Sequence, residues 1–540
     1  MYRHLYLIFV GAILFSCNRD RTEYDIIVYG GTPSGVVAAY AAGVEGKNVL
    51  LIEQTGHVGG MNSSGLNTAE TEHMIHNSIT GYADEVYLRL GKLYDSGSFD
   101  FSPRLKELYT ETGRAYAFES HVIERVFLNM LTEAGVEVVY DQFVNRVVMN
   151  GTRIGKIEMT TGQVYSGTIY IDCTYEGDLM AKAGVSYTWG REDIGTYGES
   201  LAGMRFIDDT LKGRTVTANG RLHPFFVSYD PELHIPGNGD KRVNNYNFRP
   251  TMTRIDSNRL PLYPPDNYRR EDFLFLLDYV KSRPNIRLGN LVGLYPRLNN
   301  KAAFNNQQNS TVSLGMFGGN RDYPDGSYEQ RKEIYLEHKN YTLGYLYFLS
   351  HDQAVPDALR KEVSGWGYAR DEYTDNNHFP YYLYIREARR LQGETVQTQR
   401  DIFTDRTKQD AITLGSHWVD AHHIQRIALS DSTYINEGRI WEVVDQPYEI
   451  SYKIMLPKEE ECTNLLVPVC VSVSHVAFCS VRLEPTWMQL GHAAGTAAAM
   501  VIDSLQSVHK VNIPALQERL EQQGMICNIG EDSMWEISWK

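Results

Sequence analysis

Short apolar runs separated by a glycine turn mark the first part of the chain. Asp25–Tyr29 is rich in β-branched residues, Val36–Ala42 holds small helix-compatible residues, and Asn48–Ile52 is a second apolar run. Continuous apolar runs of this length are typical of buried parallel strands. The order predicts a strand, a glycine turn, a helix and a second strand that ends at Glu53.

Further elements follow from the same kind of pattern. Glu119–Gly135 carries Val122, Val126 and Met130 at four-residue steps, which predicts an amphipathic helix. A late helix is expected to begin near Glu484, because the proline that follows it suits a first helical turn. The other predicted elements are strands over Val136–Tyr140, Phe143–Met149 and Ile169–Asp172, a turn over Met159–Gln163, and a helix or strand-to-helix stretch over Tyr381–Glu394.

The turn after the first strand reads GGTPSG, residues 30–35, one letter away from Gly-x-Gly-x-x-Gly. In that pattern Gly30 allows the tight turn, Gly35 lets the helix approach the strand, and the helix N-terminus points free N–H groups at a pyrophosphate. Thr32 stands at the second glycine of the pattern, where its side chain narrows the approach of the phosphates to the backbone, but its hydroxyl is able to donate to a phosphate oxygen. Glu53 is placed to bind ribose hydroxyls and disfavours the 2′-phosphate of NADP. Taken alone, the loop also suits a structural βαβ unit without a ligand.

Glycines continue after Glu53, at Gly56, Gly59 and Gly60, and Met61 follows. A backbone with so few side chains allows a long ligand to lie against it. These motifs resemble the FAD-binding half of the glutathione-reductase-type flavoproteins. More narrowly, they resemble a family of bacterial FAD-dependent oxidoreductases that reads Gly-Gly-x-Pro-x-Gly, then Glu, then Gly-Gly-Met, with threonine at the second glycine in some members. The resemblance implies FAD, with its ADP half on the first βαβ unit.

Two later motifs extend the resemblance. Residues 172–179, DCTYEGDL, differ from the family's Asp-Ala-Thr-x-x-Gly-Asp-Leu in Cys173, and residues 474–485 match Ser-His-x-Ala-Phe-x-Ser-x-Arg-x-Glu-Pro. In such flavoproteins a late helix points its N-terminus at the N1/O2 edge of the flavin. For Asp178, a helix-capping role and a cofactor contact are both open. The cofactor contacts that the resemblance implies are Gly30, Thr32, Pro33, Ser34, Gly35, Glu53, Gln54, Gly59, Gly60, Met61, Val144 through its backbone at the adenine, Thr174, Asp178, Glu484 and Gly491.

The resemblance covers residues 25–505 and implies an α/β fold. It consists of an FAD/NAD(P)-binding Rossmann-like domain built from both chain ends, with an inserted α+β substrate domain. The expected boundaries are 1–17 for a lipoprotein signal peptide, 24–185 and 456–510 for the two parts of the FAD-binding domain, 186–455 for the substrate or cap domain, and 511–540 for a C-terminal extension.

Composition narrows the class of partner. The 540 residues carry a formal net charge of −15 without any Lys/Arg block, which argues against nucleic acid. The 36 tyrosines suit polar, ring-shaped ligands, although ordinary core and surface positions explain them as well. Apart from Cys17 there are five cysteines, an odd number without a C-x-x-C pair, so at least one free thiol and no disulfide framework are expected.

The N-terminus has the features of an export signal. Arg3 precedes an apolar run, Leu5–Phe15, that is too short to span a bilayer, and Ser16-Cys17 follows. This ending resembles a bacterial lipobox, in which Cys17 is lipidated and becomes the first mature residue; a cleaved signal peptide and a retained anchor are the alternatives. We expect a protein at the cell surface or in the periplasm that contacts the membrane through its lipid alone.

Flavin oxidation of a C–H bond next to a hydroxyl or amine needs a base and a positive charge beside the ring. His475 is the first candidate for the base, because it lies in the flavin-side motif, and His422 and His423 are second candidates. A buried structural histidine is the alternative for each. Arg482 is a candidate for neutralising reduced flavin or binding a substrate carboxylate. No His-Glu-x-x-His, EF-hand or P-loop motif occurs, so no metal site is predicted.

Arg386 and Arg390 have two interpretations. Their spacing from Glu387 and Glu394 suits an internal salt-bridge set on a helix, and substrate contact is the alternative.

Two classes of function remain open. The leading hypothesis is an extracytoplasmic FAD-dependent oxidoreductase that transfers a hydride between flavin N5 and a small sugar-like or hydroxy-acid-like substrate. Its electron acceptor is open among oxygen, a quinone and a partner protein. The alternatives are a flavin-dependent enoate reductase of the fumarate type and a non-catalytic, glycan-binding surface lipoprotein.

Overall fold

The computed structural model describes residues 23–530, except 218, 311 and 505, together with residue 535. The predicted signal peptide and Cys17 lie outside the described residues. Among the described residues, no helix combines the length and the apolarity that a membrane span requires.

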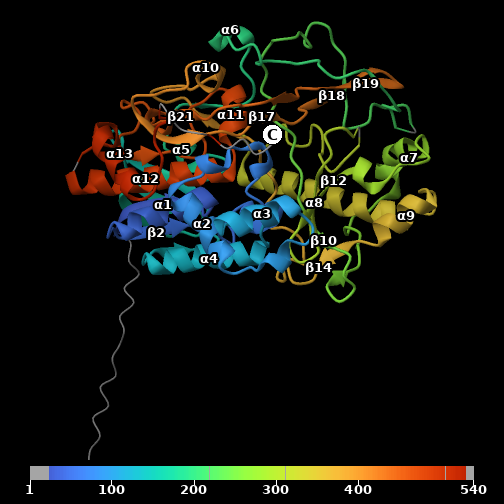
Figure 1. The fold of residues 1–540 in the computed structure, drawn as a ribbon. Helices are drawn as coiled ribbons and strands as arrows, with labels where there is room; N and C mark the ends of the chain where they lie inside the picture. Colours follow the sequence, from blue (N-terminus) through green and yellow to red (C-terminus); the bar gives the residue numbers. More distant parts are fainter. Residues whose placement is uncertain (1–22, 218, 311, 505, 531–534, 536–540) are drawn as a thin grey trace, which may run out of the picture.

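The two ends of the chain lie together on the left of Figure 1, around a seven-stranded mixed sheet with the order β3-β2-β1-β6-β5-β4 and with β22 also paired to β6. Strands β1, β2, β3, β6 and β22 are parallel; β5 pairs antiparallel with β6, and β4 pairs antiparallel with β5. The strands are β1 (Glu23–Tyr29), β2 (Val49–Ile52), β3 (Glu137–Val139), β4 (Val144–Asn150), β5 (Arg153–Met159), β6 (Val164–Asp172) and β22 (Leu465–Leu466).

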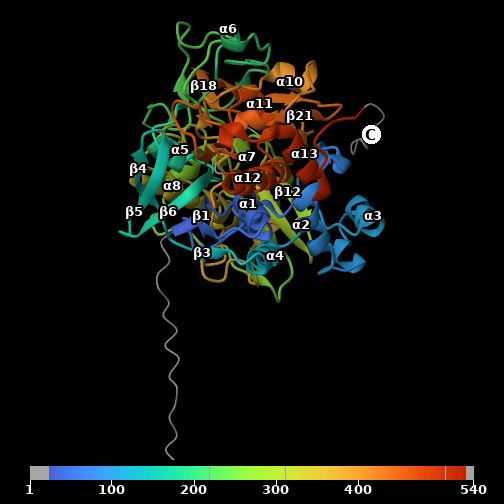
Figure 2. The same ribbon diagram turned by 90° about the vertical axis from the view of Figure 1, so that its left-hand side faces the viewer.

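Helices from both ends of the chain cover this sheet. Figure 2 shows α12, near the C-terminus, packed on α1, near the N-terminus, with α4 beyond α1. Gly495 makes the approach close, because a Cβ there would lie 2.2 Å from the Ala38 carbonyl oxygen. The helices are α1 (Pro33–Val44), α2 (Gly81–Gly91), α3 (Pro103–Thr112), α4 (Ser120–Glu133), α5 (Asp178–Lys182), α11 (His475–Val481), α12 (Glu484–Ser504) and α13 (Ile513–Gln522).

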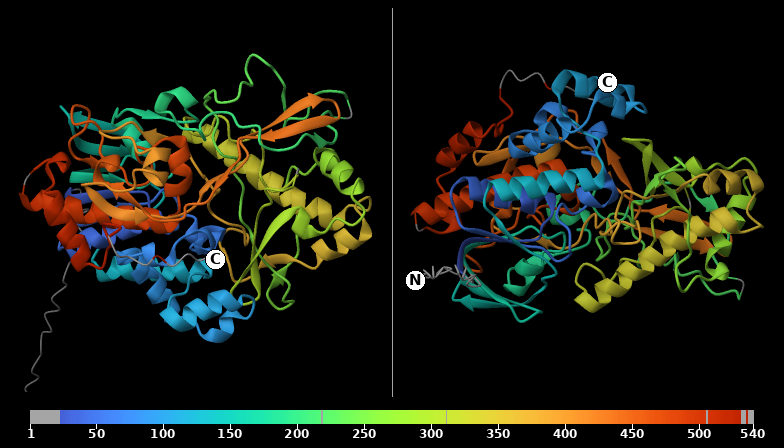
Figure 3. Two further views of the ribbon diagram at one scale, coloured as in Figure 1. Left: turned by 45° about the horizontal axis from the view of Figure 1, so that its top comes forward. Right: turned by 90° about the horizontal axis from the view of Figure 1, so that it is seen from below.

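The intervening chain builds smaller sheets, some of them beside the C-terminal helices, and a long helix on the other side of the molecule (Figure 3). One sheet has the order β11-β14-β10-β13-β12, another β8-β19-β18-β9, and three are strand pairs. The strands are β7 (Tyr187–Thr188), β8 (Leu211–Lys212), β9 (Val227–Ser228), β10 (Thr251–Thr253), β11 (Arg259–Leu260), β12 (Val292–Arg297), β13 (Lys301–Asn306), β14 (Gly367–Ala369), β15 (Arg390–Leu391), β16 (Ala411–Gly415), β17 (Val419–Ala421), β18 (Gln425–Ser430), β19 (Thr433–Glu437), β20 (Ile440–Glu442) and β21 (Tyr448–Ser451). The helices are α6 (Ile194–Tyr197), α7 (Leu274–Lys281), α8 (Tyr328–His351), α9 (Asp357–Ser364) and α10 (Gln399–Phe403).

The α/β class and the first strand–turn–helix–strand unit are confirmed. The five cysteines in the described residues are all free and buried, so the fold has no disulfide among them. One prediction is wrong: Tyr381–Glu394 is not helical, and only Arg390–Leu391 pairs as a short strand with β7.

Candidate active site

The glycine turn after β1 has the geometry expected of a nucleotide-binding loop. Gly30 has a φ of +101°, and a Cβ there would lie 2.7 Å from the Thr174 backbone nitrogen. A Cβ on Gly35 would lie 1.9 Å from the Gly30 carbonyl oxygen. The predicted roles of these two glycines, a tight turn and a close helix–strand approach, are therefore confirmed. Helix α1 begins at Pro33, as expected of a proline in a first turn.

Thr32 has a structural role that differs from the expected phosphate contact. It caps α1, because its Oγ1 accepts a hydrogen bond from the Gly35 N–H at 3.3 Å. The same hydroxyl donates to the Cys173 carbonyl at 2.8 Å. The Thr32 hydroxyl proton is therefore used within the protein, and the loop offers a pyrophosphate its backbone N–H groups.

Glu53 stands at the end of β2, where the resemblance places the ribose. Its carboxylate accepts hydrogen bonds from the Gly31 N–H at 2.6 Å and from the backbone N–H and hydroxyl of Thr55 at 2.7 and 2.8 Å. Burial raises the pKa of Glu53, and these donors partly offset that effect. A fourth donor is the Tyr382 hydroxyl, which comes from the inserted region. Tyr382 thus binds the carboxylate that a ribose would need.

The expected adenine contact is already occupied by tyrosines. The Val144 N–H donates to the Tyr29 hydroxyl at 3.0 Å, and the Val144 carbonyl accepts from Tyr328 at 2.9 Å. The Gln54 side chain donates to the same Tyr29 oxygen at 2.9 Å. A cavity of about 400 Å³ lies beside them, lined by residues that include Gln54, Phe143 and Tyr382. This cavity opens at the expected adenosine end, because Gln54 and Thr55, which follow Glu53, line it.

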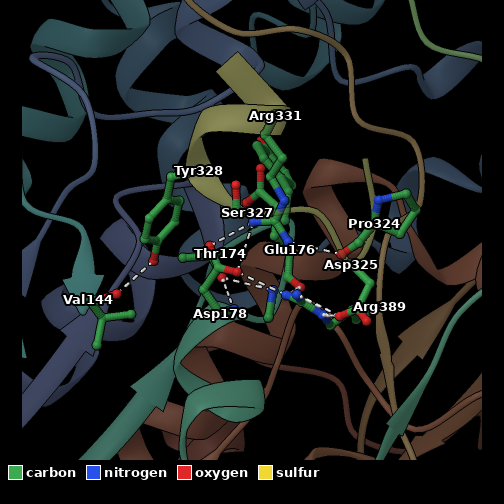
Figure 4. A network of polar contacts seen from close by, with 12 residues as sticks. Val144, Thr174, Glu176, Asp178, Pro324, Asp325, Ser327, Tyr328, Arg331 and Arg389 are labelled. Carbon is green, nitrogen blue, oxygen red and sulfur yellow. Dashed lines mark hydrogen bonds and ion pairs between the residues drawn. The ribbon is translucent and has the colours of Figure 1, made fainter. Parts of the chain in front are cut away.

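Asp178 neither caps a helix with its side chain nor lies free for a cofactor. Figure 4 shows its carboxylate between Arg331 and Arg389, at 2.8 and 2.9 Å. Burial alone would raise the pKa of Asp178, but the two guanidinium groups lower it. The turn before α5 is held by Thr174 instead, whose Oγ1 accepts from the Gly177 N–H at 3.0 Å. Asp178 and Thr174 therefore hold the walls of the site together.

The expected flavin end lies where the glycine stretch meets the start of α12. Gly59 and Gly60 have φ values of +99° and +47°. The Met61 N–H donates to the Tyr175 hydroxyl at 3.0 Å, and that hydroxyl donates to Glu484 Oε1 at 2.6 Å. Burial raises the pKa of Glu484 to about 8. One tyrosine hydroxyl thus joins two segments more than four hundred residues apart in the sequence.

Several buried polar atoms at this junction have no hydrogen-bond partner in the described structure. They are Nδ2 and Oδ1 of Asn62, Oε2 of Glu484, Oγ1 of Thr486 and Nε1 of Trp487. Buried polar groups without partners are rare in folded proteins and mark places where a ligand can provide the partner. Together with the turn at Gly30 and the carboxylate of Glu53, this set fits an FAD molecule that extends from α1 to α12.

Gly491 serves helix packing. A Cβ there would lie 2.2 Å from the Ser34 carbonyl oxygen, so α12 contacts the loop end of α1 directly. Its expected place among the cofactor contacts is therefore indirect, through the position of Ser34.

His475 is held in a defined orientation. It is 2% exposed, and its Nδ1 lies 2.9 Å from both carboxylate oxygens of Glu387. Because a carboxylate only accepts, Nδ1 carries the proton in the neutral ring and Nε2 keeps a lone pair. The buried Nε2 has no partner among the described residues. His475 and Cys479 are four residues apart and share one face of α11, and Arg482 follows at the C-terminal end of the helix.

His422 and His423 diverge, as expected of adjacent residues. His423 Nε2 contacts the Asp208 carboxylate, whereas His422 Nδ1 lies 3.4 Å from the Asn306 amide nitrogen. Burial and neighbouring arginines hold the pKa of His422 well below its usual value. His422 is therefore neutral at pH 7.

The arginines of the segment before β15 divide between two roles. Arg390 pairs with Glu387 and Glu192, so the salt bridge expected between Arg390 and Glu387 is present without a helix. Arg386 instead donates to the Asn245 carbonyl and contacts no carboxylate among the described residues.

Three residues of the site were not predicted from the sequence: Tyr175, Tyr382, and Glu387 as the partner of His475. Tyr175 lies inside the recognised DCTYEGDL motif, which was a usable signal. The other two carry no local pattern that distinguishes them from structural residues.

Comparisons with known proteins agree with this geometry. A family model described as FAD dependent oxidoreductase matches residues 25–520. A stretch of 139 residues is 27% identical to digeranylgeranylglycerophospholipid reductase 2 of Methanopyrus kandleri and covers 25% of this chain and 33% of that protein. The chain thus spans about a third of the length of the curated relative that it matches.

The solved structures that align with the chain do so weakly. The myxobacterial chondrochloren halogenase CndH aligns with a TM-score of 0.24 and 19% identity, over 32% of this chain and 41% of that one. THI4 of Thermovibrio ammonificans aligns with a TM-score of 0.21 and 21% identity, over 31% of this chain and 66% of that one. The family match over nearly the whole chain carries the assignment: the chain belongs to the FAD-dependent oxidoreductases, and FAD is its cofactor.

Proposed function

We propose that the protein transfers a hydride between flavin N5 and a carbon that bears a hydroxyl group on a small polar substrate. FAD, when bound, supplies a centre that accepts or gives two electrons with a hydride. The protein must then supply a group that holds the hydroxyl proton and a wall that excludes water.

The observation that carries this proposal is the orientation of His475. Glu387 fixes the proton on Nδ1, so the free lone pair of Nε2 is available to accept the hydroxyl proton of a substrate. Glu387 is itself oriented by the Asn244 amide at 3.1 Å and by Arg390. Such a chain of contacts resists rotation of the imidazole and favours proton transfer at one defined atom.

The test begins with the absorption spectrum of the chain purified without residues 1–17. We expect a yellow protein whose flavin band bleaches under argon with a substrate from a panel of sugars and hydroxy acids. The variant His475→Asn should keep the colour and lose the bleaching. Glu387→Gln should slow bleaching, because glutamine no longer forces the proton onto Nδ1.

His338 offers a matched control. It is also a buried histidine with an unpartnered Nε2, but its Nδ1 contacts the Ile334 carbonyl instead of a carboxylate. His338→Asn should leave bleaching unchanged. Normal bleaching in His475→Asn would remove His475 from the role of base.

The reductive direction is the second candidate, and the reductase from Methanopyrus kandleri favours it. In that direction FAD, when bound and reduced, would supply the hydride for an activated double bond, and the protein would supply the proton for the neighbouring carbon. Stopped-flow reoxidation of the photoreduced protein by fumarate, compared with succinate, tests it. If neither compound reoxidises the flavin, the oxidative direction is the one that remains.

The proposed location rests on the N-terminal sequence. We propose that Cys17 is lipidated and anchors the protein outside the cytoplasm, because a small residue and a short apolar run precede it. Radiolabelled palmitate should label the wild type in a bacterial host and fail to label Cys17→Ser. Equal labelling of both proteins would refute the anchor.

A further inference from the structure

Four buried arginines gather around two tyrosine rings beside the flavin end of the site. This arginine cluster consists of Arg249, Arg297, Arg386 and Arg482, with Tyr295 and Tyr384 between them. The guanidinium carbons of Arg386 and Arg249 lie 4.3 and 5.7 Å from the Tyr384 ring centre. Arg482 reaches the Tyr384 hydroxyl at 3.5 Å. The four arginine residues are each at most 3% exposed.

Two of these arginines have a carboxylate partner. Arg249 pairs with Glu70 at 2.8 Å, and Arg482 lies 3.4 Å from Asp420. Burial alone would raise the pKa of Glu70, but Arg249 and other cationic neighbours lower it to about 2, so Glu70 is ionised at neutral pH.

The other two arginines contact neutral groups. Arg386 donates to the Asn245 carbonyl and to Asn247 Oδ1, both at 2.7 Å. Arg297 donates to the Pro296 carbonyl at 3.0 Å. Burial lowers the pKa of Arg386 and of Arg297 to about 10, and both remain charged at pH 7. The Nε atoms of all four cluster arginines have no hydrogen-bond partner among the described residues.

Among the remaining neighbours, the Glu72 carboxylate lies near Arg297, so four arginines face three carboxylates: Glu70, Glu72 and Asp420. His422 faces the cluster and is neutral, and the pKa of His417 is lowered to about 4 by burial, so it is neutral too. A buried cation without a counter-charge costs several kcal/mol even after relaxation of its surroundings. The cluster therefore carries an excess of positive charge that an anion would stabilise.

The cluster also borders the segment that follows the Gly-Gly-Met stretch. A Cβ on Gly65 would lie 2.0 Å from the Arg249 carbonyl oxygen, so the two backbones are in contact. Glu70, five residues further along, holds the Arg249 side chain. An anion bound here would lie next to the expected flavin end of FAD.

We propose that the arginine cluster binds the carboxylate of a small organic acid. Planar guanidinium groups match a carboxylate in shape and charge. Arg386 and Arg297 both have a free Nε and no acidic partner, and of these two Arg386 stands over the Tyr384 ring, whose hydroxyl Arg482 also reaches. Resting on the proposed function, this assigns the substrate to the hydroxy acids or sugar acids and excludes neutral sugars.

The test is calorimetric titration of the FAD-loaded protein, with the flavin difference spectrum as a second readout. The acids are glycolate, lactate, succinate and glucuronate, and each is compared with its neutral counterpart: ethylene glycol, propane-1,2-diol, butane-1,4-diol or glucose. We expect at least one acid to bind, and its counterpart to bind at least about tenfold more weakly. Inorganic phosphate should bind more weakly than that acid, because its tetrahedral shape does not match a planar carboxylate site.

Substitutions at Arg386 locate the effect. Arg386→Gln should weaken binding of that acid about 10- to 100-fold, the range for a hydrogen bond to a charged group. The affinity of Arg386→Lys for that acid should lie between those of the wild type and Arg386→Gln, because lysine keeps the charge and loses the planar fork. Arg426→Gln removes a buried arginine that stacks on Phe317 outside the cluster, and should leave acid binding unchanged. Circular dichroism and flavin content check the folding of each variant.

Several outcomes would overturn the proposal. These are binding of none of the acids, equal binding of a neutral counterpart or of phosphate, and unchanged binding in Arg386→Gln. A shift of the flavin reduction potential in Arg386→Gln without a change in acid binding would assign the cluster to the flavin instead. The two proposals fail separately: binding of the hydroxy acids without bleaching of the flavin by any of them contradicts hydride transfer alone, and a neutral sugar that bleaches the flavin contradicts the carboxylate site alone.

Discussion

The hydroxyl of Tyr382 and a ribose require the same carboxylate, that of Glu53. In the structure without ligand the hydroxyl donates to Glu53 Oε1. Tyr382→Phe removes that donor and keeps the ring, which lines the cavity at the expected adenosine end. If the ribose must displace the hydroxyl, the variant should bind FAD more tightly than the wild type, because it has no hydrogen bond to give up.

The magnitude follows from the surroundings of Glu53. A hydrogen bond to a charged group contributes about 1.5–3 kcal/mol. The lower end applies here, because Gly31 and Thr55 still supply three donors to the carboxylate when the tyrosine hydroxyl is absent. About 1.4 kcal/mol corresponds to a tenfold change, so the dissociation constant of FAD should fall about tenfold.

The assay is titration of the deflavinated protein with FAD, followed by quenching of flavin fluorescence. Tyr381→Phe is the matched control, because the hydroxyl of Tyr381, the preceding residue, donates to Asp375 and not to Glu53. It should bind FAD like the wild type. Unchanged or weaker FAD binding by Tyr382→Phe would refute the competition and mean that hydroxyl and ribose share the carboxylate.

Three further predictions concern stability and assembly. Gly491→Ala should lower both the melting temperature and the ratio of flavin to protein, because its Cβ would overlap the Ser34 carbonyl. The control Gly56→Ala should change neither quantity, because no atom lies within 4 Å of the added Cβ. Equal effects of the two substitutions would contradict the packing argument. Asp178→Asn should destabilise the folded state by about 3–5 kcal/mol, because it leaves two buried guanidinium groups without their shared carboxylate. A lower urea midpoint of unfolding measures this loss, and an unchanged midpoint counts against it. Burial raises the pKa of Glu484 from 4.5 to about 8, so within that window the folded state holds a proton that the unfolded state releases, and stability falls as pH rises. Glu484→Gln cannot ionise, and its melting temperature should exceed that of the wild type by a margin that grows from pH 5 to pH 8; a constant margin would refute the assignment.

The first βαβ unit was predictable because its signals are local. The apolar runs, the glycines at the turn and Pro33 at the first helical position each restrict the backbone where they stand. The helix predicted over Tyr381–Glu394 was wrong for the opposite reason. Its charges are spaced as on a helix, but Arg386, Glu387 and Arg390 are buried and bind partners far away in the sequence. Tertiary contacts decide the backbone there, and one sequence does not contain them in readable form.

The site shows the same division. Glu53 and the glycines were found because their roles depend on neighbours within one unit. The expected phosphate contact of Thr32 and adenine contact of Val144 were altered by Cys173 and by two tyrosines, which reach them from other elements. The arginine cluster draws its members from four separate segments, so its excess charge becomes visible only once those segments are folded together.

The pairing of β22 with β6 has a consequence for biosynthesis. Leu465 and Leu466 align with Tyr170 and Ile171, and α12 follows them. A ribosome-bound chain therefore cannot assemble the complete coenzyme pocket until almost all of it has been made. If the protein crosses a membrane unfolded, it must acquire its coenzyme on the far side, and the supply of free FAD there would set the yield of active enzyme.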